Sequence, residues 1–416
     1  MNRAAIPSFV CVLLAVALIG RTTPAAGAAT SDAIQRNLPV VLLQTTNAIE
    51  GDLRVEGTVQ ILCPSGIGCG ITNRLPARIG LHGATSRSYP KKSYAVALAQ
   101  PERLLDLRTN THWILNAAYI DRSLMRHKLS YDLFRSWSAD GAPRMAVASR
   151  FVEVQLNGQY VGAYLLMERV DRPLLGLRPF RSNDVSHACI YKAIDHAANF
   201  SYAGHDGYEQ REPDPLAHPY WRPLDEFNHF VSTAPDAKFF DSQTGIGARL
   251  DLDNAIDFHL LVLLTSNGDG ITKNFILARD GEASGGASRR FFFVPWDYDG
   301  TFGRNWDASQ VAPSQWLSNH LFDRLLDQSE YRARFAARWR MLRERGLSAQ
   351  SIQAMIDANA RTLGPAAQRN AVRWPGDGWP YPDQVTFAED IAEMRRWIGE
   401  RIQWLDQEIK SLADRP

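Results

Sequence analysis

The segment Thr265-Ser-Asn-Gly-Asp269-Gly-Ile-Thr-Lys-Asn274 follows the apolar run Leu260 to Leu264 and precedes the strand-like run Phe275 to Asp280. A Gly/Ser-rich turn, residues 281–288, then leads into Arg290-Phe-Phe-Phe-Val-Pro-Trp-Asp297-Tyr-Asp299-Gly300. Apolar runs bounded by Gly and Asp, with a turn of about eight residues between the last two, are typical of a helix followed by a β-hairpin. The hairpin would bring Asp297 and Asp299 back beside Asp269 and Asn274.

The spacing of Asp269 and Asn274 is the D-x-x-x-x-N spacing of phosphotransferases of the protein-kinase type. In those enzymes the Asp orients the attacking hydroxyl, and the Asn and a later Asp coordinate Mg²⁺. Asp297, with Asp299 two residues on, supplies that later carboxylate, and Mg²⁺ prefers such hard oxygen ligands. Asp and Asn are also common turn formers and helix caps, so the spacing alone leaves a purely structural role open.

The first residues of the chain predict export. Residues 1–28 have a short basic start, an apolar core from Phe9 to Ile19 that is too short to span a bilayer, and small residues from Pro24 to Ala28. This pattern is typical of a secretory signal peptide. We expect cleavage near Ala28 and a secreted or periplasmic protein with no membrane span after cleavage. An uncleaved membrane anchor is the alternative.

The cysteines are consistent with an oxidising compartment, and the balanced charge argues against a nucleic-acid-binding protein. Cys63 and Cys69 enclose a Gly/Pro-rich loop whose ends could meet in a disulfide in an oxidising compartment, and Cys189 lies among apolar neighbours as a buried thiol. The chain has 46 Lys and Arg against 45 Asp and Glu, so it creates no global field to hold nucleic acid. With 45% hydrophobic residues and 11 Trp it has ample material for a core.

From Leu38 to Asp171 the pattern is mostly β. Short strands are expected near residues 40–43, 53–59 and 77–83, one helix over 121–137, and a hairpin that turns at Asn157-Gly158. A polar loop, Gly83 to Ser93, carries Arg87, Lys91 and Lys92, which could neutralise phosphates or simply be solvated. Apolar spacing of three and four predicts helices beyond Gly303, over residues 320–326, 331–345, 348–363 and 390–412. Residues 181–241 are rich in Pro, His and Asp without clear periodicity.

This order of elements is the order found in the two-lobed protein-kinase fold, and the sequence resembles the CotH kinase family, which is named from a spore-coat protein. Five stretches carry the resemblance, and they occur in the order of the family: Gly83 to Tyr94, Asp121 to Arg126, Phe151 to Glu168, Asn267 to Asn274, and Pro295 to Gly303. The resemblance implies an α+β, two-lobed protein-kinase-like fold. Its β-rich N-lobe would cover residues 38–171 and its mainly helical C-lobe, which carries the catalytic and metal-binding loops, residues 172–416.

The resemblance also implies roles for individual residues. Asp269 is similar to the catalytic Asp of the family, Asn274 and Asp297 to its Mg²⁺ ligands, and Asp299 to a further metal ligand or a carboxylate behind one. Lys92, with Lys91 as its rival, is similar to the lysine that contacts phosphate, and Arg87 is expected to reach the same phosphates. Glu168 stands where the connection between lobes would meet adenine, as a hinge residue or a salt-bridge partner.

The activity that the resemblance implies is transfer of the γ-phosphoryl group of ATP, with Mg²⁺ or Mn²⁺, to Ser or Thr of a protein substrate. Transfer of another group, such as adenylyl, and a non-catalytic secreted adhesin or binding protein of the same fold are the alternatives. The chain departs from the family at one loop, which usually opens Arg-Gly-Asn-Ser and here reads His82-Gly-Ala-Thr85. This change removes one guanidinium and one amide near the expected phosphates.

Overall fold

The computed structural model describes residues 36–64, 73–139, 142–182, 186–281, 290–375 and 384–415. The expected signal peptide and Cys69 lie outside the described residues. Cys63 is disulfide-bonded, and Cys189 is a free, buried thiol. Among the described residues, no helix combines the length and the apolar character needed to cross a membrane.

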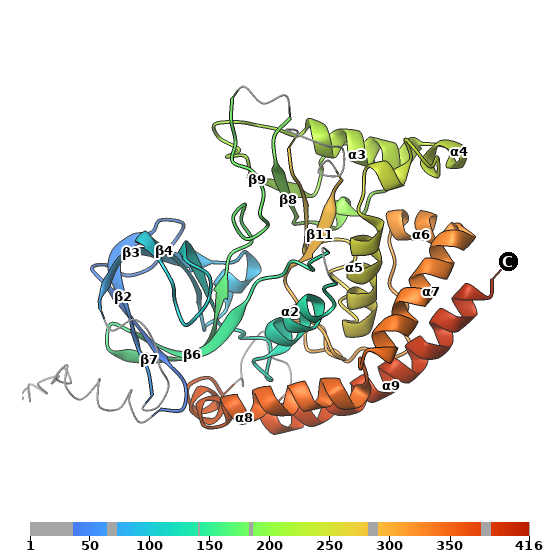
Figure 1. Ribbon diagram of the computed structural model, residues 1–416. Helices are drawn as coiled ribbons and strands as arrows, with labels where there is room; N and C mark the ends of the chain where they lie inside the picture. The colour runs from blue at the N-terminus through green and yellow to red at the C-terminus, as the bar shows by residue number, and fades with distance from the viewer. Residues whose placement is uncertain are drawn as a thin grey trace, which may run out of the picture.

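The N-terminal part of the chain forms a closed seven-stranded barrel, at the left of Figure 1, in the order β1-β2-β3-β4-β5-β7-β6. Parallel pairing of β1 with β6 closes it, and the other pairs are antiparallel. Side chains alternate across each strand, so Tyr94, Val96 and Leu98 fill the interior while Ala95 faces outward. The strands are β1 (Val40–Thr45), β2 (Val55–Leu62), β3 (Leu75–His82), β4 (Ser93–Glu102), β5 (Asn110–Asn116), β6 (Ser149–Leu156) and β7 (Gln159–Glu168).

The second sheet has four antiparallel strands in the order β11-β10-β8-β9. Figure 1 shows it above the helices of the C-terminal part, with α3 and α4 beside it. The elements are β8 (Cys189–Ala193), β9 (Tyr208–Glu212), β10 (Phe275–Arg279), β11 (Phe292–Pro295), α3 (Arg222–Thr233) and α4 (Asp236–Phe239). Short 3₁₀ turns occur at Thr85–Ser88 (η1), His196–Ala198 (η2) and Ile246–Ala248 (η3).

Helix α5 (Leu252–Thr265) is the centre of the C-terminal part. It is predominantly apolar and is buried from Asn254 to Thr265, as expected for a helix that other elements surround. The Asp251 carboxylate caps its first turn by accepting from the amide of Asn254 at 3.1 Å. At its other end Ser266 adopts a left-handed conformation, and Arg401 Nε donates to the carbonyl of Leu263 at 2.8 Å. Burial lowers the pKa of Arg401 to about 9.

The remaining helices wrap α5 and the barrel. They are α2 (Arg126–Ser136), α6 (His320–Asp327), α7 (Ser329–Glu344), α8 (Ala349–Arg373) and α9 (Phe387–Ala413). Figure 1 shows α8 running beneath the barrel and α9 alongside α7. Helix α8 is tied to β7, because Asn370 Oδ1 accepts from the amide of Ala163 at 3.1 Å and Trp374 Nε1 donates to the carbonyl of Val161 at 2.9 Å.

The α+β class, with β structure first and helices later, is confirmed. The closed barrel was not predicted, because β1 and β6 are far apart in sequence and nothing in either strand signals their pairing. Residues 181–241, which lack periodicity, contain β8, β9, α3 and α4, whose short lengths give the pattern too few repeats. The likeness to the two-lobed protein-kinase fold stays a prediction.

The buried histidine of α5 generates a prediction about pH. His259 has no exposed surface, its Nε2 contacts the carbonyl oxygen of Leu317 at 2.8 Å, and burial lowers its pKa to about 4. Between pH 4 and 6.5 the unfolded chain therefore binds a proton that the folded chain does not, so stability falls as pH falls through this window. We expect His259 to account for a loss of about 2 kcal/mol between pH 7 and pH 5.

Urea unfolding of wild type and His259→Gln at both pH values measures this loss. The variant should be less stable at pH 7 and should have a smaller difference between pH 7 and pH 5. His229→Gln removes an exposed histidine of α3 and is the control. Equal pH slopes for wild type and His259→Gln would contradict the prediction.

Candidate functional site

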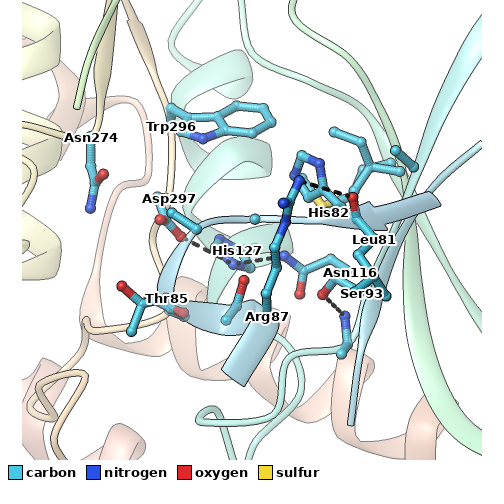
Figure 2. Close-up of a pocket in the computed structure, with 18 of the residues that line it drawn as sticks. Leu81, His82, Thr85, Arg87, Ser93, Asn116, His127, Asn274, Trp296 and Asp297 are labelled. Carbon is cyan, nitrogen blue, oxygen red and sulfur yellow. Dashed lines mark hydrogen bonds and ion pairs between the residues drawn. The ribbon is translucent and has the colours of Figure 1, made fainter. Parts of the chain in front are cut away.

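A cavity of about 860 Å³ lies between the outer face of the barrel and the second sheet. Six of the eight residues singled out from the sequence line it, although they come from segments far apart in the chain. Figure 2 shows Asn274, Asp297 and Arg87 in this cavity with Trp296 beside them. The six are Arg87, Lys91, Asp269, Asn274, Asp297 and Asp299, whereas Lys92 and Glu168 are not among the described residues that line it.

The first acid is carried by the loop that leaves α5. The backbone carbonyl of Asp269 accepts from the amides of Thr272 and Lys273, at 3.2 and 2.8 Å, so the loop is a tight turn. Two nitrogen-bearing side chains flank its carboxylate: Lys273 Nζ lies 3.2 Å away and His196 Nε2 3.8 Å away. The side chain of Asp269 is 29% exposed, so it stays accessible to a ligand from the cavity.

The second acid pair follows β11. Asp297 has a φ of +60° and Asn274 a φ of +57°, and both types of residue tolerate this left-handed region better than most. Two side chains of α2 hold the turn: the Tyr131 hydroxyl accepts from the amide of Asp297, and His127 Nδ1 accepts from the amide of Tyr298, each at 2.9 Å. The turn conformation therefore depends on helix α2, which comes from the N-terminal half of the chain.

Asn267 joins the two acidic loops. Its Oδ1 accepts from the amide of Gly270 at 2.9 Å, and its Nδ2 donates to the carbonyl of Asp297 at 3.2 Å. The side chain is almost fully buried, so both contacts are shielded from water. One amide thus fixes the loop of Asp269 against the loop of Asp297.

The acids and His127 lie close enough to share a cation. One ligand atom from each of His127, Asp297 and Asp299 falls within 4.8 Å of the others. However, His127 Nδ1 accepts from a backbone amide, so the neutral imidazole carries its proton on Nε2. Nε2 lies 3.7 Å from Asp297 Oδ1 and 3.3 Å from Asn116 Nδ2, and a ring nitrogen that carries a proton cannot ligate a metal. The donor set that remains, carboxylates with the amide oxygen of Asn274, fits a hard cation such as Mg²⁺ or Mn²⁺.

The electrostatics of the acid cluster also favour a cation. Burial raises the pKa of Asp299 well above its ordinary range, and the nearby charges of Asp297 and Asp121 raise it further. Burial lowers the pKa of His127, against the opposing effect of Asp297 and Asp121. Carboxylates gathered in this way repel one another until a cation binds or one of them is protonated.

Lys91 and Lys92, the two residues that precede β4, have different environments. Lys91 is 1% exposed, and its Nζ donates to the carbonyls of Ala117 and Ala163 at 2.6 and 2.5 Å. Burial lowers its pKa well below the ordinary value. Lys92 Nζ donates to the carbonyl of Arg87 at 2.6 Å and so holds η1 in place. The ammonium groups of both lysines are therefore engaged with backbone carbonyls of the barrel region.

The other two residues predicted from the sequence are held by ion pairs. Arg87 lines the cavity from η1 and forms an ion pair with Asp52. Glu168 is buried at the end of β7, where its carboxylate accepts from the amides of Ala148 and Arg108 at 2.8 and 3.2 Å. Arg108 Nε lies 3.4 Å from the same carboxylate. Of the two roles considered for Glu168, these contacts match the salt-bridge partner.

Several cavity residues were not predicted. Lys192 of β8 lies over the Trp296 ring, with Nζ 5.6 Å from its centroid, and Trp296 faces His82 edge to face with ring centroids 6.5 Å apart. Burial lowers the pKa of Lys192, against the charge of Asp297, which raises it. The sequence contained a signal for Lys192, because it is a single lysine inside the apolar strand Cys189–Ala193. The signal for His127 was weaker, because it is one of several polar residues in the helix expected over 121–137.

A buried network of ion pairs and hydrogen bonds connects the elements that carry the site. Arg126 Nη1 donates to Asp121 Oδ1 and to Asp390 Oδ2, each at 2.6 Å, and its Nε donates to the carbonyl of Thr301 at 2.8 Å. Burial alone would lower the pKa of Arg126, but the charges of Asp390 and Asp121 raise it. The network connects the start of α2, the start of α9 and the chain just after Asp299.

The segments that form the cavity belong to a region shared with known proteins. The family model described as CotH kinase protein matches residues 79–405, which include the acids, the barrel face and the helices around them. The chain belongs to the CotH kinase family. It is also 31% identical over 269 residues to the inner spore coat protein H of Bacillus subtilis (strain 168), covering 62% of this chain and 68% of the relative. Membership of the CotH kinase family confirms the resemblance seen in the five ordered stretches.

The contacts of Glu168 predict a cost in stability when it is changed. Glu168→Gln replaces one acceptor oxygen with a donor that faces a backbone amide, so we expect the free energy of unfolding to fall by about 1 to 3 kcal/mol. Chemical denaturation measures this change. Glu56→Gln, at an exposed position of β2, should leave stability within about 0.5 kcal/mol of wild type. A variant as stable as wild type would show that the Glu168 contacts do not stabilise the fold.

The ion network predicts a larger loss. Arg126→Met leaves Asp121 and Asp390 buried without their cation, and breaking a buried pair in this way costs about 3 to 5 kcal/mol. The matched control is Arg396→Met, which removes an exposed i,i+4 pair with Glu400 on α9 and should cost less than about 0.5 kcal/mol. Thermal or chemical unfolding of the two variants tests the contrast, and similar losses for both would contradict it.

Proposed function

We propose that the protein is an exported kinase of the CotH family that transfers the γ-phosphoryl group of ATP to a Ser or Thr hydroxyl of a protein substrate. The observation that carries the proposal is the convergence of Asp269, Asn274, Asp297 and Asp299 on one large cavity. The spacing of these residues matches the arrangement by which kinases orient a hydroxyl and hold Mg²⁺ on phosphates. ATP, Mg²⁺ and the protein acceptor are all part of the proposal.

Asp269 is the residue proposed to act on the acceptor. Its carboxylate, flanked by Lys273 and His196, would accept a hydrogen bond from the acceptor hydroxyl and orient its oxygen toward the γ-phosphorus. The new bond joins that oxygen to phosphorus while the bond between phosphorus and the β,γ-bridging oxygen breaks, and ADP leaves. The proton of the hydroxyl passes to the Asp269 carboxylate or to the transferred phosphate.

Asn274, Asp297 and Asp299 would hold a divalent cation, which would neutralise charge on the phosphates when bound. Hydrogen bonds within the chain hold Asp297 in position without a bound cation or nucleotide. The amide of Asp297 is fixed by Tyr131, its carbonyl by Asn267, and its carboxylate faces the Nε2 of His127. Positioning of this kind is what a phosphoryl-transfer site contributes to the rate.

The barrel face offers space for the base of a nucleotide. Ala95, Ile114 and Met167 line the cavity on the outer face of the barrel, where the small side chain of Ala95 leaves room. His82 and Trp296 add aromatic surface, and Lys192 places a cation over the Trp296 ring and within the electrostatic reach of Asp297. We therefore assign the first phosphate contact to Lys192, since the ammonium groups of Lys91 and Lys92 already donate to backbone carbonyls.

The sequence and the relative both support the proposed export. Residues 1–28 have the pattern of a cleaved signal, and the relative from Bacillus subtilis is a spore coat protein by name. Both favour action outside the cytoplasm. Transfer of an adenylyl group would use the same cavity, and mass spectrometry of the modified protein distinguishes a phosphoryl from an adenylyl adduct.

The central prediction concerns the acids. Incubation of the mature protein with γ-labelled ATP and Mg²⁺ or Mn²⁺ should transfer label to the protein itself or to an added protein. Asp269→Asn and Asp297→Asn should each lower the rate at least about a hundredfold, because each removes a group that acts on the transferring phosphoryl or its acceptor.

Asp253→Asn is the matched control, because Asp253 lies at the exposed start of α5 and pairs with Arg334 away from the cavity. It should keep the rate of wild type. Unchanged transfer in Asp269→Asn and Asp297→Asn would refute the assignment of the site. No transfer by the wild-type protein with any nucleotide would refute the kinase proposal.

A further inference from the structure

The cavity also carries a group of cationic residues to which the proposed chemistry gives no role. Arg169, which follows β7, lines the cavity together with Arg54, Arg211 and His112. These four residues, which we call the arginine cluster, come from the barrel, from the segment that leaves it and from β9. The acids of the proposed metal site line the same space on other elements.

Positive charge in the arginine cluster is only partly neutralised by described residues. Arg211 has one acidic partner, Glu209, at 2.8 Å. The guanidinium groups of Arg54 and Arg169 have no ion pair or hydrogen bond with any described residue, although Arg169 is half-buried. Asp171, two residues beyond Arg169, already binds Arg108 and Asn110 at 2.8 and 2.9 Å.

The members of the cluster repel one another. Burial lowers the pKa of Arg54, and the charge of Arg169 lowers it further. Burial lowers the pKa of His112, and the charges of Arg169 and Arg54 lower it further, whereas the charge of Asp171 raises it. Burial lowers the pKa of Arg211 too, with Glu209 opposing the effect and Arg169 adding to it. Arg169 is thus the common neighbour of the cluster, and an anion bound beside it would relieve this repulsion.

A path of polar side chains joins the cluster to the acids. Lys192 and Glu209 are paired across β8 and β9, and Arg211 follows on the same strand. His82 lies within the electrostatic reach of Lys192 and Asp297 as well as of Arg169 and Arg211. A ligand that extends across the second sheet from the acids would therefore meet the cluster.

We propose that the arginine cluster is a subsite for acidic side chains of the protein acceptor, either carboxylates or phosphates already present on it. The inference rests on the proposed function, because the phosphates of ATP would bind beside the acids and Lys192, and the acceptor would lie beside the nucleotide along β9, which carries Arg211. Arginine suits the role, since its planar guanidinium binds carboxylate and phosphate through two parallel hydrogen bonds. The mouth of the cavity also exposes Ile194 and Trp306, at 49% and 51%, as apolar contacts for a peptide.

Peptide binding tests the subsite without relying on catalysis. The probes are two fluorescein-labelled peptides with one central Ser, flanked by Glu in one and by Gln in the other. Fluorescence anisotropy with the mature protein, without nucleotide, should show that the Glu peptide binds and that added NaCl weakens it. Arg169→Gln and Arg54→Gln should each weaken the Glu peptide about tenfold, the loss of one charge-assisted contact, and leave the Gln peptide unchanged.

Arg361→Gln removes an exposed arginine of α8 that does not line the cavity, and it should bind both peptides as wild type does. Arg54 is itself exposed, so its variant separates loss of contact from loss of fold. Equal affinity for the two peptides, or an equal effect of Arg361→Gln, would overturn the proposal. So would a loss of ATP affinity in Arg169→Gln with unchanged peptide affinity, which would assign the cluster to the nucleotide.

The Asp297→Asn variant separates this proposal from the proposed function. It should lose phosphoryl transfer yet bind the Glu peptide with the affinity of wild type, because Asp297 is not a member of the arginine cluster. Glu-peptide binding by a wild-type protein that transfers no phosphate would leave the subsite standing and remove the kinase assignment. Phosphoryl transfer without any preference for the Glu peptide would do the reverse.

Discussion

The buried guanidinium of Arg126 is the constraint on which the site depends. It lies at the first turn of α2 and binds Asp121, Asp390 and the carbonyl of Thr301. Two carboxylates with almost no exposure require a cation, and one arginine satisfies both in a fixed geometry. Because these partners come from three distant segments, the position of α2 cannot change without moving the start of α9 and the turn that carries Asp299.

The position of α2 matters because side chains of its first two turns hold the turn that carries Asp297. His127 and Tyr131 are one helical turn apart, so both face the same side, where each accepts from one amide of the turn at Asp297 and Tyr298. That turn has a left-handed residue at Asp297, whose conformation costs about 1 to 2 kcal/mol without support. The helix supplies that support, and Asn267 extends it to the loop of Asp269. Buried side chains therefore hold the backbone of both acidic loops in place.

The sequence predicted the acids and not their supports, and the reason is physical. Asp269, Asn274 and Asp297 lie within one short stretch, so helix, loop and hairpin signals are enough to bring them together. His127, Lys192 and Arg169 reach the cavity from three separate elements, and only the packing of α2 and β8 around it determines that they meet. The lysines show a related limit: Lys91 and Lys92 are adjacent, and which carbonyls their ammonium groups reach depends on the register of β4.

The cavity holds groups of both signs of charge. Carboxylates gather on the loops after α5 and β11, where they repel one another until a cation binds, and the guanidinium groups of the arginine cluster repel one another until an anion binds. Lys192 lies within the electrostatic reach of both Asp297 and Arg211. A neutral ligand would relieve neither repulsion, and a single small ion would relieve only one. The two proposed partners, a nucleotide that brings a cation with its phosphates and an acceptor that brings an acidic group of its own, would together relieve both.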